Sequence, residues 1–234
     1  MQAAEVAEIA VIVSEAFAAV GVQATVVGGS ALALHLPSVI ASNDVDVVLE
    51  LPTGLRPTME EIAAVMAGLG FSKESGRHWA LGNCLVEFPG GGIEEPVALI
   101  GTARAPLRVL SLEAMLVQRL RSFKNTGSTE HGMQAVAIIG AIGDRLDMGS
   151  FAPMARTEDV VREYNALRVL ALGHDAPTVT VAALLDLYWR LRAPRVQAEP
   201  EPAGRGHATD VTPEHPSPPA ILDVDEAPGL PHPE

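Results

Sequence analysis

The chain has 234 residues and a formal net charge of -13 at pH 7. This acidity argues against the broad positive surface of a protein that binds duplex nucleic acid, although a local basic patch is compatible with it. The single cysteine, Cys84, excludes an internal disulfide framework and a multi-cysteine zinc site, and it fits a reducing compartment, so we expect a cytoplasmic protein. No segment has the apolar length of a membrane helix, and the N-terminal 20 residues are unlike a signal peptide.

The first elements alternate helix and strand. Apolar residues at helical spacing predict a helix over residues 4–20 that ends at Gly21, and the apolar run at 24–27 predicts a strand. Serine side chains accept hydrogen bonds from free amides at a helix start, so we expect Ser30 to cap a short helix over residues 31–36.

The remaining elements follow two patterns. An amphipathic helix is predicted over residues 57–69, with Pro57 in its first turn and Gly70 past its end. Short apolar runs predict strands up to residue 110, and only helical patterns follow. The strands are expected at 44–49, 71–73, 78–81, 84–88, 96–100 and 107–110, and the helices at 111–123, 133–142, 157–172 and 179–191.

These patterns divide the chain into three parts. Residues 1–110 predict an α/β core, and residues 111–193 predict a small helical region. Residues 194–234 hold 10 of the 18 prolines and contribute -6 to the net charge, so we expect a disordered acidic tail. Within that tail, the apolar stretch at 220–224 is suited to a short docking motif.

Residues that carry chemistry gather between positions 26 and 50. Glycine permits close backbone approach and amides at a helix start attract phosphate, so Gly28, Gly29 and Ser30 suit a triphosphate. After 13 intervening residues come Asp44 and Asp46, which share one face of the predicted strand because side chains alternate. Mg²⁺ prefers hard oxygen ligands and neutralises phosphoryl charge, so this pair is a candidate magnesium site.

An apolar strand, a Gly-Gly-Ser turn and an Asp-x-Asp strand, in this order, resemble the nucleotidyltransferase superfamily related to DNA polymerase beta. The resemblance implies a nucleotidyltransferase-like α/β (α+β) core with a mixed sheet, followed here by the helical region and the tail. It also implies that Gly28, Gly29 and Ser30 position the nucleotide. In the same way, it implies that Asp44 and Asp46 bind divalent metal ions.

The resemblance points to further positions. In such proteins a third carboxylate on a later strand activates the acceptor hydroxyl, and Glu87 stands at that place, where Asp is more usual. The alternative for Glu87 is an ordinary surface residue of a strand. Residues 107–120 resemble bacterial nucleotidyltransferase-like proteins of the abortive-infection and toxin-antitoxin type. Those proteins often continue with Lys-Asp or Arg-Asp, whereas this chain has Lys124-Asn125.

Three cations lie on one predicted helix segment. At their spacing, Arg119, Arg121 and Lys124 are expected to form an exposed basic face, with contact to a phosphate as the alternative. Lys124 is the candidate nucleotide-binding residue among them. His35 and His131 lack a metal-ligand partner at a recognisable spacing, so we expect structural or surface roles for both.

The resulting expectation is a nucleotidyltransferase that depends on Mg²⁺, with Mn²⁺ as the alternative ion. It would move a nucleoside monophosphate from a nucleoside triphosphate to a hydroxyl acceptor and release pyrophosphate. A tRNA end, a protein side chain and a small molecule such as an aminoglycoside all remain open as acceptors. The rival hypothesis is a catalytically inactive binding module that has a protein partner in a toxin-antitoxin or phage-defence pair. Neither hypothesis involves a membrane.

Overall fold

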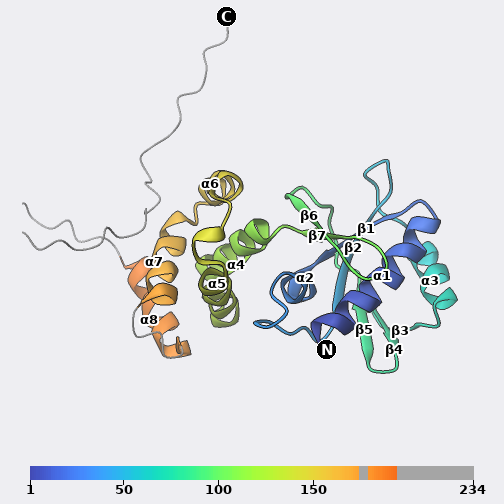
Figure 1. Cartoon of the computed structure of the whole chain (residues 1–234), viewed down its shortest axis with the longest axis horizontal. Coiled ribbons are helices and arrows are strands. Elements are labelled where there is room, and N and C mark those ends of the chain that lie inside the picture. Colours follow the sequence, from blue (N-terminus) through green and yellow to red (C-terminus); the bar gives the residue numbers. More distant parts are fainter. Residues whose placement is uncertain (174–178, 194–234) are drawn as a thin grey trace, which may run out of the picture.

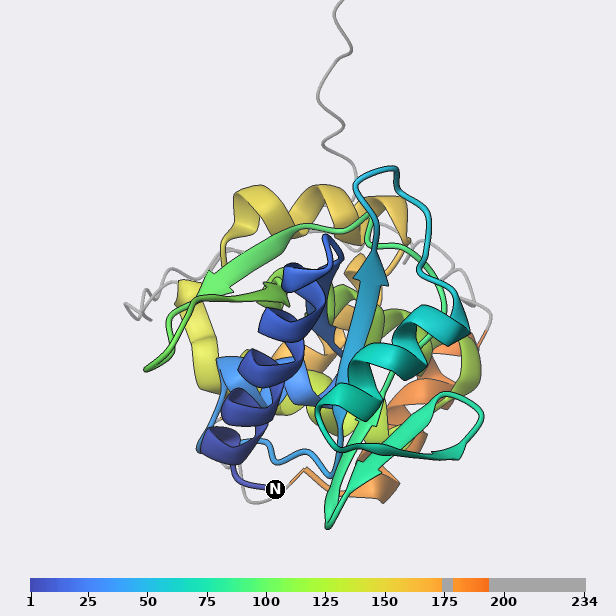
Figure 2. The ribbon, with the colours of Figure 1, turned by 90° about the vertical axis from the view of Figure 1, so that its right-hand side faces the viewer.

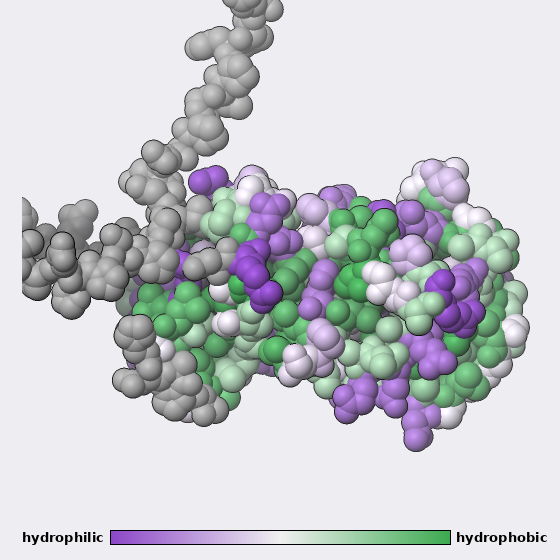
Figure 3. All heavy atoms as spheres, viewed as in Figure 1, coloured by the Kyte–Doolittle hydropathy of each residue, from purple (hydrophilic) through white to green (hydrophobic). Residues whose placement is uncertain are grey.

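A computed structural model describes residues 1–173 and 179–193 (Figure 1). The predicted acidic tail at 194–234, with its apolar stretch, lies outside the described residues. Within the described residues, no helix has both the length and the apolar character needed to cross a membrane. The face shown in Figure 3 intersperses hydrophilic and hydrophobic residues.

The first 110 residues form a seven-stranded sheet with three helices. The helices are α1 (Ala3–Ala19), α2 (Gly28–His35) and α3 (Met59–Gly68), and the strands are β1 (Gln23–Val27), β2 (Val45–Glu50), β3 (Ser72–Ser75), β4 (His78–Leu81), β5 (Cys84–Glu87), β6 (Val97–Ile100) and β7 (Leu107–Leu110). Helices α1 and α3 cover the sheet face that is turned toward the viewer in Figure 2. Helix α2 lies on the side of the core that is nearest to the helical region in Figure 1.

The sheet is mixed, as the sequence predicts. Its strand order is β3-β4-β5-β2-β1-β7-β6. Strand β1 pairs antiparallel with β2 and parallel with β7, whereas β2 pairs parallel with β5. The parallel register of β2 and β5 places Asp46 directly opposite Glu87. The topology thus brings together two carboxylates that are 41 positions apart in the sequence.

The second part of the described chain is helical, and its bounds are α4 (Leu112–Thr126), α5 (Thr129–Ile142), the 3₁₀ turn η1 (Gly143–Arg145), α6 (Met148–Thr157), α7 (Val161–Leu172) and α8 (Val181–Arg192). Ser111 caps α4 directly after β7, because its buried Oγ accepts a hydrogen bond from the Ala114 amide at 3.1 Å. The hydrophobic core runs without a break from the sheet into these helices and includes Val47, Leu116 and Leu184.

The predicted helices differ from the structure in their extent: α5 starts at Thr129 rather than at residue 133, and the helix predicted over 157–172 is divided. The pattern favours a single helix over 157–172, but α6 ends at Thr157 and α7 starts at Val161. Asp159 stands between them with a φ of +53°, a left-handed conformation that interrupts a right-handed helix. Helix α6 was not predicted. It contains Pro153 and starts after Asp147, whose carboxylate accepts a hydrogen bond from the Gly149 amide at 2.9 Å.

Candidate active site

The Gly-Gly-Ser segment forms the first turn of α2, which corrects the expectation that Ser30 caps a helix beginning at residue 31. The helix begins at Gly28, where a φ of +63° turns the chain directly out of β1. The buried Ser30 hydroxyl donates a hydrogen bond to the Val27 carbonyl at 2.8 Å and accepts one from the Asp46 amide at 3.0 Å. Ser30 therefore fixes the start of α2 against the strand that carries Asp46.

The two glycines let the backbone of α2 approach this strand closely. A Cβ added to Gly28 would lie 2.7 Å from the Asp46 Cγ and would overlap the carboxylate oxygen. A Cβ added to Gly29 would lie 3.1 Å from the Ser42 Oγ. The backbone amide of Gly29 lowers the pKa of the Asp46 carboxyl group. The glycines thus place backbone amides beside an acidic side chain, an approach that a side chain at Gly28 would block.

Three predicted site residues form one acidic cluster. Carboxylate oxygens of Asp44, Asp46 and Glu87 all lie within 4.8 Å of one another. Asp46 is in β2 and Glu87 faces it from β5, while Asp44 precedes β2 by one residue. The Ser42 hydroxyl donates to the Asp44 Oδ1 at 3.3 Å and adds a polar group to the same end of β2. Such a group of hard oxygen atoms fits a divalent cation.

The carboxylates of the cluster repel one another. The pKa of Asp46 is raised from 3.8 to about 6, first by burial and then by repulsion from Asp44 and Glu87. The Gly29 amide and the positive charge of Arg119 act in the opposite direction. A bound divalent cation would compensate the repulsion between the carboxylates, so the cluster is suited to a metal ion.

Glu87 also faces two basic side chains of its neighbouring hairpin. Its Oε1 lies 3.5 Å from the Nη2 of Arg77, and its Oε2 lies 3.3 Å from the Nε2 of His78. The Arg77 side chain is largely exposed, so this pair contributes little to stability. The pairs do fix the position of a carboxylate whose side chain is only 19% exposed.

Arg119 departs from the exposed basic face that its sequence spacing predicts. It is buried, with 8% of its surface exposed, on the same side of α4 as Met115, Leu116 and Leu120. The spacing of this apolar stripe, with Arg119 three residues after Leu116, was the signal available in the sequence. Arg121 has a side chain that is 48% exposed and pairs with Glu158, as an exposed cation is expected to do.

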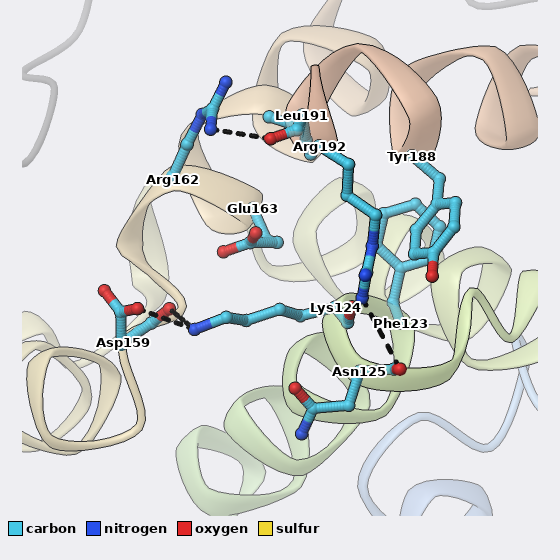
Figure 4. A pocket seen from close by; sticks show the side chains of 9 residues that line it. All are labelled: Phe123, Lys124, Asn125, Asp159, Arg162, Glu163, Tyr188, Leu191 and Arg192. Carbon is cyan, nitrogen blue, oxygen red and sulfur yellow. Dashed lines mark hydrogen bonds and ion pairs between the residues drawn. The ribbon is translucent and has the colours of Figure 1, made fainter. Parts of the chain in front are cut away.

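Lys124 is not brought to the acidic cluster. Its Nζ donates to the carbonyl oxygen of Asp159 at 2.6 Å and to its Oδ2 at 2.7 Å. Figure 4 shows it in a separate pocket of the helical region, where Arg192 stacks on Tyr188 at 4.6 Å. This pocket is lined by the end of α4, the α6–α7 turn, α7 and α8.

The two histidines link elements around the site. The Nε2 of His35 lies 2.8 Å from the Leu110 carbonyl oxygen, which joins α2 to the end of β7. The Nδ1 of His131 lies 2.5 Å from the Ser122 Oγ, which joins α5 to α4. Burial and the nearby Arg119 lower the pKa of His131. Both rings hold helices in place, in agreement with the expected structural roles.

No protein-family model matches the chain. No curated protein matches it either. Solved structures, among them the following three, are similar to the chain at low sequence identity. The solution structure of the antibiotic-resistance factor ANT(2'')-Ia has 16% identity and a TM-score of 0.46, and the match covers 70% of this chain and 98% of that chain. The crystal structure of ANT(2'')-Ia in complex with adenylyl-2''-tobramycin has 16% identity and a TM-score of 0.43, over 65% and 98% of the two chains.

The third structure is an antigenic nucleotidyltransferase-like protein from Paracoccidioides brasiliensis, with 13% identity and a TM-score of 0.46 over 68% of this chain and 91% of that one. These scores describe a distant likeness of fold.

Proposed function

We propose that the chain is a nucleotidyltransferase that uses Mg²⁺, or alternatively Mn²⁺, to transfer a nucleoside monophosphate from a nucleoside triphosphate to a hydroxyl acceptor. One observation carries the proposal: three carboxylates whose oxygens lie within 4.8 Å of one another stand directly beside a helix start built from two glycines. Neither half of this arrangement is specific by itself. Together they offer a site for a divalent cation next to a backbone cradle for phosphate.

The proposed roles follow from the positions of the residues. Gly28, Gly29 and Ser30 present the start of α2 to the triphosphate, where backbone amides favour negative charge. Asp44 and Asp46 hold the metal ion, which when bound supplies positive charge to the phosphoryl oxygens. Lys124 has no part in this proposal, because its ammonium group is bonded twice to Asp159.

Glu87 is the proposed acceptor of the proton from the attacking hydroxyl. The acceptor oxygen forms a bond to the α-phosphorus, the bond from that phosphorus to the bridging oxygen breaks, and pyrophosphate leaves with the electron pair. The contacts of Glu87 with Arg77 and His78 orient its carboxylate toward the end of β2. The acceptor is a tRNA end, a protein side chain or a small molecule, which the assay below distinguishes.

The decisive variant is Asp46→Asn. It removes one metal ligand while keeping the size of the side chain, so nucleotidyl transfer should fall by about a hundredfold or more, since metal stabilisation of phosphoryl charge is worth several kcal/mol. The assay follows label from each α-labelled triphosphate into tRNA, protein and aminoglycoside acceptors, with pyrophosphate release as a second readout. Glu60→Gln, on the exposed side of α3, is the matched control.

Unchanged transfer by a folded Asp46→Asn protein would contradict the proposal. Wild-type protein that transfers no nucleotide to any acceptor would also contradict it. In that case, stoichiometric copurification of one partner that is indifferent to Asp44 and Asp46 would favour the binding module in a toxin-antitoxin or phage-defence pair.

A further inference from the structure

The pocket of the helical region contains a buried carboxylate that the proposed reaction does not use. Glu163, in the first turn of α7, is 7% exposed, and its Oε2 is a buried atom without a hydrogen-bond partner among residues 1–173 and 179–193. Its side chain lines a cavity of about 290 Å³. Buried polar atoms of native proteins are nearly always hydrogen-bonded, and an unpartnered one is costly. A ligand that donates a hydrogen bond to this oxygen would remove that cost.

Two cations that line the cavity bond to oxygens other than the Glu163 Oε2. The Lys124 Nζ bonds Asp159 at 2.6 and 2.7 Å, and the Arg162 Nη1 donates to the Leu191 carbonyl at 2.6 Å. Figure 4 shows these contacts and draws none to Glu163. Burial raises the pKa of Glu163, whereas the charges of Lys124 and Arg162 lower it. Both cations therefore lie near the carboxylate without satisfying its Oε2.

Arg192 is the third cation of the cavity, and its position is fixed by two kinds of contact. Its Nη2 donates to the carbonyl oxygens of Lys124 and Asn125 at the end of α4, and its guanidinium stacks on the Tyr188 ring at 4.6 Å. Arg162 and Arg192 are both exposed. Since a guanidinium has five N–H donors, each of these arginines keeps donors for a ligand besides those that fix its position.

The charges that line the cavity define the chemistry that it can bind. Three basic and two acidic side chains give the lining a charge of +1, which disfavours a polyamine. A carboxylate or phosphate alone would offer Glu163 further acceptor oxygens and no donor. Within the described part of the chain, three metal-ligating side chains meet only in the acidic cluster, so a metal ion is disfavoured here. A molecule that carries both an ammonium group and an anionic group meets both requirements.

We propose that this cavity binds a free α-amino acid, whose ammonium group donates to the Glu163 Oε2 and whose carboxylate accepts from Arg162 and Arg192. Paired guanidinium donors bind a carboxylate strongly. A cavity of about 290 Å³ is at the lower end of the usual range for ligand pockets, which favours a molecule smaller than a nucleotide. The cavity shares no lining residue with the acidic cluster. The inference thus goes beyond the proposed nucleotidyl transfer and does not depend on it.

A purely structural role for Glu163 predicts a different change in stability. If its carboxylate held α7 against α4 through Lys124, Glu163→Met would lower the Tm of the protein without ligand. If it is kept for a ligand, Glu163→Met removes an unpartnered buried charge, and the protein without ligand keeps or gains thermal stability. Glu130→Met is the matched control, because Glu130 also lies in a first helical turn, is exposed and is outside the cavity.

The test measures thermal unfolding and calorimetric binding of the full chain with each of the proteinogenic L-amino acids. We expect at least one amino acid to raise the Tm of wild type. Glu163→Met should bind it about ten- to hundredfold more weakly, as loss of a hydrogen bond between charged groups predicts. Arg162→Met should weaken binding about tenfold through the carboxylate. Glu130→Met should bind as wild type does, and the amine and the acid that keep only one of the two charged groups should bind more weakly than the amino acid.

Each outcome supports or overturns the inference. Wild-type protein that binds no amino acid overturns it, and so does equal affinity of Glu163→Met and wild type. An amine or an acid that binds as tightly as the amino acid would show that the class of ligand is wrong. A lower Tm of Glu163→Met without ligand, or failure of both Glu163→Met and Glu163→Gln to fold, would show that the carboxylate is structural. Asp46→Asn should bind the amino acid as wild type does, whether or not it transfers nucleotide.

Discussion

Gly28 combines a left-handed backbone with close approach to an acidic side chain. Its φ of +63° allows α2 to start directly at the end of β1, and its missing Cβ leaves room for the Asp46 carboxylate. Gly82 has a similar φ of +60°, but a Cβ added there would meet nothing within 4 Å. Alanine substitutions at these two glycines therefore separate two free-energy costs. One is the cost of the left-handed backbone conformation, and the other is the cost of a clash with the Asp46 carboxylate.

For Gly82→Ala we expect only the conformational cost, about 1–2 kcal/mol of unfolding free energy. Gly28→Ala should cost more, because the new methyl group must displace the Asp46 carboxylate, and it should also abolish nucleotide binding. Denaturant unfolding and nucleotide titration of both variants provide the measurement. Equal stability loss in the two variants would show that the contact between Gly28 and Asp46 is unimportant.

The raised pKa of Asp46 predicts a pH dependence of stability. In the unfolded chain Asp46 loses its proton near pH 4, whereas in the folded protein it keeps the proton up to about pH 6. Between these values the folded state binds more protons than the unfolded state, so its contribution to stability falls as the pH rises. The Asp46→Asn protein has no carboxyl group that titrates at this position. Its stability relative to wild type should therefore increase from pH 4 to pH 6.

The comparison is made by denaturant unfolding of both proteins across that pH range in the presence of a chelator. Saturating Mg²⁺ should reverse the difference above pH 6, because a bound cation favours the ionised carboxylate. Parallel stability curves for wild type and Asp46→Asn would show that the pKa of Asp46 is not raised in the folded protein.

The residues of the acidic cluster were predicted, whereas the burial of Arg119 was not, although its spacing from Leu116 places it on the apolar stripe of α4. The alternation of side chains along a strand indicated a shared face for Asp44 and Asp46, whereas Glu87 was expected only from the resemblance to a family. The burial of Arg119 depends on how α4 packs against α2 and α5, which charge spacing along one helix does not reveal. Long-range packing decides whether a cation on an amphipathic helix points to solvent or to the core.

At the scale of elements, the start of α4 connects the sheet to the helix that carries Arg119. Ser111 ends the strand-to-helix passage as a buried cap, and its backbone amide donates to the Pro96 carbonyl at 2.9 Å. Thr58 caps α3 in the same way, with its Oγ1 accepting from the Glu61 amide at 3.2 Å, but it is exposed. Ser111 and Thr58 are thus comparable caps, one at the start of α4 and one away from it.

Ser111→Ala and Thr58→Ala should each lower the unfolding free energy by about 1 kcal/mol, the usual cost of losing an N-cap. Only Ser111→Ala should also weaken binding of a nucleoside triphosphate with Mg²⁺, because it loosens the first turn of α4 directly after β7, which pairs with the strand that leads into α2. Thermal unfolding and calorimetry of the same samples test both parts. A similar loss of affinity in Thr58→Ala would mean that general destabilisation weakens binding.

Most elements were predictable because their signals are local. Strand β4 and strand β7 have the predicted bounds, and Gly70 follows the end of α3 with a φ of +84°. The break between α6 and α7 was not predictable from its own sequence. It is held by Lys124, which bonds both the carbonyl and the carboxylate of Asp159 from 35 positions away.

At the scale of the whole molecule, the two parts of the described chain differ in charge. Residues 1–110 carry -7, whereas residues 111–193 contain nine acidic and nine basic residues and are neutral overall. The sheet core holds the acidic cluster, and the helical region holds Arg119, a buried cation. A metal-bound triphosphate would be held by both parts at once, although neither part alone has charges suited to it.

This division predicts where ligand binding protects the backbone from hydrogen exchange. With Mg²⁺ and nucleoside triphosphate, protection should rise at the start of α2 and at β2, and also along α4 and the first turn of α5, because the ligand is contacted from both sides. A chelator should remove it everywhere in wild type, because the phosphates then face three unscreened carboxylates. If wild-type protection is confined to the sheet core, the helical region takes no part in holding the nucleotide.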